Sequence, residues 1–81
     1  MTHRVWIIDI IKEKQRADSL HPPMHSLHEG YALILEELDE LWEKIRLAKN
    51  IDDRPQGITE EAIQIAAMAL RFLDAFGDDD I

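Results

Sequence analysis

The sequence predicts an all-α protein in which three helices per chain assemble into an oligomeric helical bundle. Three segments repeat apolar residues with the helical period, and no segment alternates apolar and polar residues over the length of a strand. With 81 residues and no cysteine, the chain forms at most one domain and has no disulfide to stabilise it. A core this small is marginal, so we expect association with further copies. We assign residues 1–77 to one helical domain and residues 78–81 to an acidic tail.

The first predicted helix covers residues 2–17, with Thr2 as its N-cap. Its first half is apolar over more than one stripe, whereas its second half is polar. A short helix that is apolar on several sides is normally covered on several sides. We therefore expect a partner subunit against its apolar residues, which are Val5, Trp6, Ile7, Ile8, Ile10 and Ile11.

The second predicted helix covers residues 27–48 and follows a loop that Pro22 and Pro23 keep from being helical. Ser26 and Glu29 have the spacing of a capping box. Spacing by about 100° per residue separates an apolar side from an acidic side. The apolar side holds Leu27, Tyr31, Ile34, Leu38, Leu41, Trp42 and Ile45, and the acidic side holds Glu29, Glu36, Asp39, Glu40 and Glu43. Glu37 is the exception, at the edge of the apolar side.

The third predicted helix covers residues 60–76, after a loop over residues 50–57. Thr59 is expected at the N-cap, with Ile58 and Ile63 forming a hydrophobic staple, and Gly77 follows the last helical residue. This helix is apolar on nearly every side. Its polar exceptions share one stripe, which is formed by Glu61, Gln64 and Arg71.

Charge and hydropathy exclude several partners. The formal net charge of −8 opposes binding to a polyphosphate backbone, so we expect no nucleic-acid partner. No apolar run approaches the roughly 20 residues that cross a bilayer, and Asp9 interrupts the first one, so we expect neither a membrane span nor a signal peptide. Together with the lack of cysteine, this predicts a cytoplasmic protein.

The acidic residues of the second and third helices predict a divalent-metal site. Glu37 and Glu40 lie one turn apart on one face, about 5–6 Å apart at Cβ, which allows them to share a cation. Glu61 and Gln64 have the same spacing on the third helix, and carboxylates brought together need cations between them. The alternative is structural: Lys44 pairs with Glu40 on the surface, Glu61 lies at position N2 and meets water, and Arg71 forms a salt bridge to the second helix.

The remaining candidates are three histidines and two tryptophans. His21, His25 and His28 allow three interpretations: a zinc site, a loop at the edge of a substrate site, or ordinary surface residues. Trp6 and Trp42 are expected as core or interface anchors.

Three strings of residues resemble a MazG-like domain of the all-α nucleoside triphosphate pyrophosphohydrolase superfamily. They are His-Pro-Pro-Met-His-Ser-Leu-His-Glu-Gly-Tyr (residues 21–31), Ile-Leu-Glu-Glu-Leu-Asp-Glu-Leu-Trp (residues 34–42) and Glu-Ala-Ile-Gln-Ile-Ala-Ala-Met-Ala-Leu-Arg (residues 61–71). The family pattern is Glu-Glu-x-x-Glu, a spacer, then Glu-x-x-Asp. The chain matches the first half, but in the second half Gln64 stands where the family has Asp.

The resemblance implies hydrolysis of a nucleoside triphosphate to the monophosphate and pyrophosphate, with Mg²⁺ or Mn²⁺, by a homodimer or homotetramer. It implies that Glu37, Glu40, Glu61 and Gln64 are the metal ligands. For catalysis, Glu36 is our candidate to orient the attacking water, and Arg71 and Lys44 are our candidates for phosphate contact. Because a glutamine oxygen brings no negative charge, Gln64 weakens the expected site. The alternative function is a non-catalytic helical module with a degenerate metal site.

Overall fold

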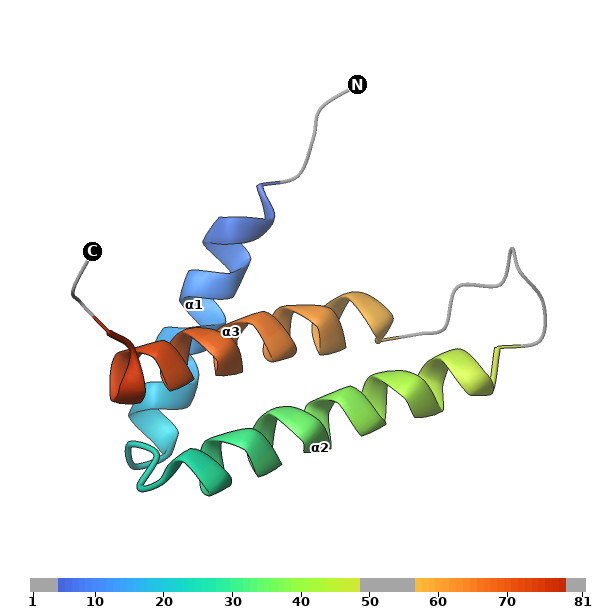
Figure 1. Ribbon diagram of the computed structural model, residues 1–81. Coiled ribbons are helices and arrows are strands. Elements are labelled where there is room, and N and C mark those ends of the chain that lie inside the picture. Colours follow the sequence, from blue (N-terminus) through green and yellow to red (C-terminus); the bar gives the residue numbers. More distant parts are fainter. Residues whose placement is uncertain (1–4, 49–56, 79–81) are drawn as a thin grey trace.

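The described part of the chain contains three helices, as predicted. The computed structural model describes residues 5–48 and 57–78, and within these ranges it contains no strand. The helices are α1 (Trp6–Leu20), α2 (Leu27–Arg46) and α3 (Ile58–Phe76). In Figure 1, α2 and α3 lie side by side over most of their length, whereas α1 crosses behind the later part of α3.

Helix α3 is the central element. It packs against both α1 and α2, whereas α1 and α2 make no direct helix-to-helix contact. This arrangement follows from the sequence because α3 is apolar on nearly every side and has two faces to cover. The polar stripe of α3 then lies between its two neighbours.

Helix α1 is shifted along the sequence relative to the prediction. It begins at Trp6 after a non-helical Val5, so the predicted start at Thr2 is wrong, and Thr2 itself lies outside the described residues. It also continues beyond Ala17 to Leu20, where the His21 N–H donates to the Ala17 carbonyl. The reason is local: Pro22 restricts only the residue before it, so the helix can extend to residue 20.

Helix α2 begins as predicted and ends two residues early, at Arg46. The Ser26 hydroxyl accepts from the Glu29 N–H at 3.0 Å, which confirms the N-cap. The Glu29 carboxylate accepts from the His25 N–H at 2.7 Å instead of from the Ser26 N–H, so the capping box is displaced by one residue.

Helix α3 has a different N-cap from the predicted one. Gly57 occupies the cap with φ of 85°, and its carbonyl accepts from the Glu61 N–H. Thr59 is therefore inside the helix, and Ile58 is its first residue, so the predicted cap and staple are wrong. A glycine takes this left-handed conformation without steric cost, which allows the helix to begin earlier. Gly77 follows the helix as predicted, in an extended conformation. The predicted loop over residues 50–57 lies outside the described residues, except for Gly57.

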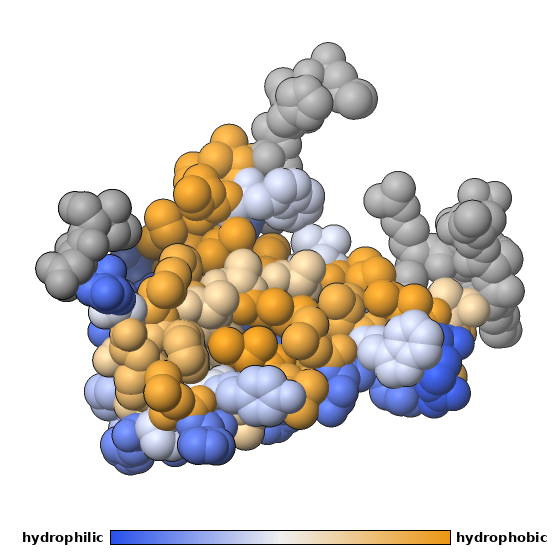
Figure 2. Space-filling view, viewed as in Figure 1, coloured by the Kyte–Doolittle hydropathy of each residue, from blue (hydrophilic) through white to orange (hydrophobic). Residues whose placement is uncertain are grey.

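Much of the apolar surface of the chain is not covered. In the described part of the chain few apolar residues are buried, and two of them are alanines. They are Ala17, Met24 and Ala67. Trp42 is 58% exposed and Tyr31 is 64% exposed, and both lie on the predicted apolar side of α2. Figure 2 shows apolar residues over much of one face, from α1 across α3 and towards α2. No helix in the described part combines the length and the apolar character that a bilayer crossing requires.

Candidate metal site

Three of the predicted ligands lie together between α2 and α3. Glu37 and Glu40 come from consecutive turns of α2, and Glu61 comes from the first turns of α3. Each offers one carboxylate oxygen, and these three oxygens lie within 4.8 Å of one another. We call these residues the acidic cluster.

Two oxygens of the acidic cluster are buried without a hydrogen bond. They are Oε2 of Glu37 and Oε2 of Glu61. Glu61 is only 5% exposed, so the interpretation that it simply meets water is wrong. Counting from Gly57, it is the fourth helical residue and not the second, which turns it inward. A buried oxygen without a partner costs about 1–3 kcal/mol, and a cation between these oxygens would remove that cost.

One lysine neutralises part of the acidic cluster. The Lys44 ammonium donates to Oε1 of Glu61 at 3.1 Å. This contact replaces the surface pair with Glu40 that the structural alternative expected. One ammonium faces three carboxylates, so the cluster keeps an excess of negative charge. That excess, together with oxygen-only ligands, suits a hard divalent cation such as Mg²⁺.

The acidic cluster holds a proton near neutral pH. Burial, with the neighbouring Glu61 carboxylate and the charges of Glu40 and Glu36, raises the pKa of Glu37 to about 7. Burial alone would raise the pKa of Glu61 too, but hydrogen bonds with Glu37 and Lys44 outweigh it and lower that pKa. The charge of Glu61 also raises the pKa of Glu40. The two carboxyl groups therefore titrate together, with the pKa of Glu37 raised and that of Glu61 lowered.

Gln64 and Glu36 each line a cavity that also reaches Glu37 of the acidic cluster. Gln64 lies one turn after Glu61 and lines a small recess of about 90 Å³ together with Glu37 and with Glu13 and Arg16 of α1. Glu36 is exposed and lines a larger cavity of about 340 Å³ that also reaches Glu37. The polar half of α1 thus forms one wall of the site, which the sequence analysis missed. The i, i+3 spacing of Glu13 and Arg16, which pair with each other, was the available signal.

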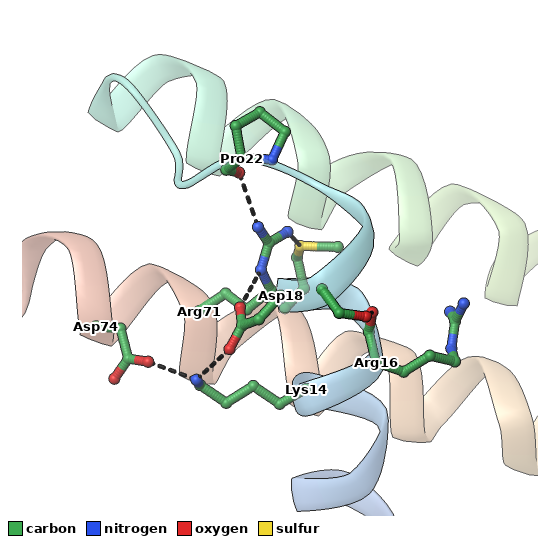
Figure 3. A network of polar contacts seen from close by, with 8 residues as sticks. Lys14, Arg16, Asp18, Pro22, Arg71 and Asp74 are labelled. Carbon is green, nitrogen blue, oxygen red and sulfur yellow. Dashed lines mark hydrogen bonds and ion pairs between the residues drawn. The ribbon is translucent and has the colours of Figure 1, made fainter.

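Arg71 is a buried ionic anchor. Its side chain is 4% exposed, and its Nε donates to Asp18 at the end of α1 at 2.9 Å. One terminal nitrogen donates to the Pro22 carbonyl at 2.9 Å, and the other contacts the Met68 sulfur at 3.8 Å. Figure 3 shows the guanidinium between Asp18 and Pro22. The salt bridge expected by the structural alternative exists, but its partner is on α1 and not on α2.

The same network continues to the end of α3. Lys14 pairs with Asp18 and with Asp74, so it joins α1 to α3 (Figure 3). Its hydrogen bond lowers the pKa of Asp18, and the two aspartates raise the pKa of Lys14. Because Arg71 also holds the Pro22 carbonyl, this network fixes the loop after α1 at the edge of the site. The i, i+4 spacing of Lys14 and Asp18 was the only sequence signal for it.

The three histidines do not come together as a metal site in the described part of the chain. Among the described residues, the acidic cluster is the one group of three histidine or acidic side chains that lie close enough to share a metal ion. His21 lines the 340 Å³ cavity. The imidazole Nδ1 of His25 lies 3.8 Å from Oε2 of Glu29, beyond hydrogen-bond distance.

Comparison of the chain with protein-family models, with curated proteins and with solved structures finds no match.

Proposed function

We propose that the protein is a homo-oligomeric nucleotide pyrophosphohydrolase that uses Mg²⁺ or Mn²⁺ to cleave a nucleoside triphosphate to the monophosphate and pyrophosphate. The observation that carries this proposal is the acidic cluster with its two buried, unpartnered oxygens. The position of the cleaved bond, between the α- and β-phosphates, comes from the resemblance to MazG-like domains. The cytoplasmic location remains a prediction.

Each residue of the site has a proposed role. Glu37, Glu40 and Glu61 hold the cation, and Gln64 supplies a neutral oxygen from the next turn of α3. The bound cation would neutralise phosphate oxygens and activate a water molecule. Lys44 orients the Glu61 carboxylate and is the better placed cation for a phosphate. A phosphate contact by Arg71 would require its guanidinium to give up Asp18 or Pro22.

Two observations favour a second function. Gln64 stands where the family pattern has Asp, so the site has one charge fewer than that pattern. The chain also exposes large apolar residues on all three helices. A non-catalytic helical interaction module with a weakened metal site would share both features.

Metal binding is tested by thermal unfolding. A cation that binds only the folded state raises the melting temperature by mass action. We expect Mg²⁺ and Mn²⁺ to stabilise the parent protein and Glu40→Gln to abolish most of that gain. Glu43→Gln is the matched control, because Glu43 is exposed on the same helix and pairs with Arg46. Equal gains in Glu40→Gln and the control would contradict the site.

Catalysis is tested by pyrophosphate release from a panel of nucleoside triphosphates with Mg²⁺ or Mn²⁺. Release of orthophosphate alone would contradict the cleavage position. No release by a folded protein that is nevertheless stabilised by metal would favour the non-catalytic module.

A further inference from the structure

The 340 Å³ cavity beside the acidic cluster is unlike the cluster itself. Its lining includes the apolar side chains of Leu33 on α2, Met68 on α3 and Pro22 in the loop between α1 and α2. Glu37 borders both the cavity and the acidic cluster. A ligand whose phosphates reach the cluster would therefore place its other end in this cavity. Its volume lies within the range of small-molecule sites.

The charges of the cavity disfavour phosphate groups. Glu29, Glu36 and Glu37 all line it. Arg71 is its one lysine or arginine among the described residues, and the guanidinium nitrogens of Arg71 are already bound to Asp18, Pro22 and Met68. A phosphate would thus meet carboxylates without a free cation. An uncharged, partly apolar group that donates hydrogen bonds suits the cavity better.

Glu36 is a free carboxylate acceptor of the cavity. Glu29 already accepts a hydrogen bond from the His25 N–H, and Glu37 belongs to the acidic cluster. Glu36, in contrast, accepts no hydrogen bond from any residue of the described part, and its side chain is exposed on the cavity wall. An ionised carboxylate accepts hydrogen bonds and cannot donate them.

We propose that this cavity binds the nucleobase of the nucleotide, and that Glu36 selects bases that carry an exocyclic amino group. The inference rests on the proposed function in taking a nucleotide as the ligand. Leu33 and the polarisable Met68 side chain supply apolar contacts for the flat base. The amino group of cytosine or guanine donates to Glu36. The oxo group of uracil would place its oxygen against the carboxylate.

The test is equilibrium binding of nucleoside monophosphates, which requires no turnover. CMP is compared with UMP, and GMP with IMP, by titration calorimetry in Mg²⁺; each pair differs at an amino-bearing position. A hydrogen bond to a charged group predicts about ten- to a hundredfold tighter binding of the amino member. In Glu36→Gln the preference should fall to near unity, because an amide both donates and accepts. Asp39→Asn makes the same charge change one turn away and should keep the preference.

Four outcomes would overturn the inference. They are equal affinities within each pair, an unchanged preference in Glu36→Gln, a loss of preference in Asp39→Asn as well, and no binding of any monophosphate at millimolar concentration. If Glu36→Gln slows hydrolysis of every triphosphate alike and leaves the binding ratio unchanged, Glu36 is catalytic and does not read the base. An amino preference without pyrophosphate release would support this inference and contradict the proposed reaction. Pyrophosphate release without an amino preference would support the proposed reaction and contradict this inference.

Discussion

Glu37 combines two conditions that oppose its ionisation. It is partly buried beneath the site, and it lies against a second carboxylate of the acidic cluster. The pKa of about 7 means that the folded protein binds a proton there at pH values where the unfolded chain has released it. A cation held by the proposed site would therefore compete with this proton for the same oxygens.

The raised pKa of Glu37 predicts how the stability of the metal-free protein depends on pH. Between pH 5 and 8 the folded state binds more protons at Glu37 than the unfolded state, so the contribution of Glu37 is present at pH 5 and lost by pH 8. We expect the melting temperature in EDTA to fall over this range, and Glu37→Gln to flatten the fall and to be the more stable protein at pH 8. Saturating Mg²⁺ should reverse the order at pH 8. Identical pH profiles for Glu37→Gln and the parent in EDTA would contradict the shared proton.

Gln64→Asp is predicted to lower the stability of the metal-free protein and to raise its affinity for Mg²⁺. A fourth carboxylate next to Glu37 adds repulsion, so we expect a lower melting temperature in EDTA. With Mg²⁺ the added charge should tighten binding severalfold, as measured by titration calorimetry. Gln64→Asn is the control of the same length without the charge. If Asn and Asp bind Mg²⁺ equally well, residue 64 is not a ligand.

The sequence predicted which residues gather but not how each is partnered. Spacing within one helix brought Glu37 together with Glu40, and the requirement of a buried carboxylate for a partner added Glu61. The pairing of Lys44 with Glu61, and of Arg71 with Asp18, depends on how the helices cross. That geometry is set by the packing of α3 against both neighbours, which a residue pattern does not specify.

At the level of the elements, α2 and α3 approach closely at Gly30. The position is buried, and a Cβ atom placed there would lie 2.5 Å from Cδ2 of Phe72 and 3.1 Å from the Met24 sulfur. Phe72 is itself held against Phe76, with ring centroids 5.1 Å apart. The start of α2 can therefore meet the end of α3 only because residue 30 has no side chain.

Gly30→Ala is predicted to destabilise the protein by up to about 2 kcal/mol, since an overpacking cost of about 1–3 kcal/mol outweighs the gain of about 1 kcal/mol in helix propensity. Chemical denaturation of the parent and the variant measures this change. Phe72→Ala is the second arm of a double-mutant cycle. In that background Gly30→Ala should be neutral or stabilising. If Gly30→Ala is equally harmful with and without the Phe72 ring, the cause is not this contact.

The period of the apolar residues predicted correctly which segments are helical, but the residues at which the helices begin and end were predicted less reliably. The N-cap at Ser26 was correct because its hydroxyl has a free N–H to bind one turn later. The cap at Thr59 was wrong because Gly57 begins the helix earlier through its backbone conformation. The side chain of Ser26 therefore allowed the N-cap of α2 to be predicted, whereas the N-cap of α3 depends on the left-handed backbone conformation of Gly57.

At the level of the whole molecule, one chain leaves an extensive apolar surface exposed. The exposed residues include Trp6, Ile7 and Ile8 on α1, Leu38 and Trp42 on α2, and Leu73 on α3. Patches of this extent are unusual in monomers and mark interaction surfaces. The sequence predicted this from the width of the apolar faces, but it did not indicate which surfaces join.

We expect light scattering at micromolar concentration to give at least twice the 9.4 kDa mass of one chain. Trp42→Glu should lower the assembled fraction, because it places a charge in the middle of the apolar side of α2. Asp39→Asn, on the acidic side of the same helix, should leave the mass unchanged. A monomeric mass for the parent protein would contradict the oligomer.

The central position of α3 also sets the order in which parts of the chain can open. Because α1 and α2 do not touch each other through their helices, α1 can detach while the α2–α3 pair persists, and α2 can detach while α1 stays on α3. Neither partial opening frees α3. Its backbone amides are therefore released to solvent only when the whole molecule unfolds, whereas those of α1 and α2 exchange earlier through smaller openings. Protection against hydrogen exchange is thus expected to be highest in the helix that carries Glu61, Gln64 and Arg71.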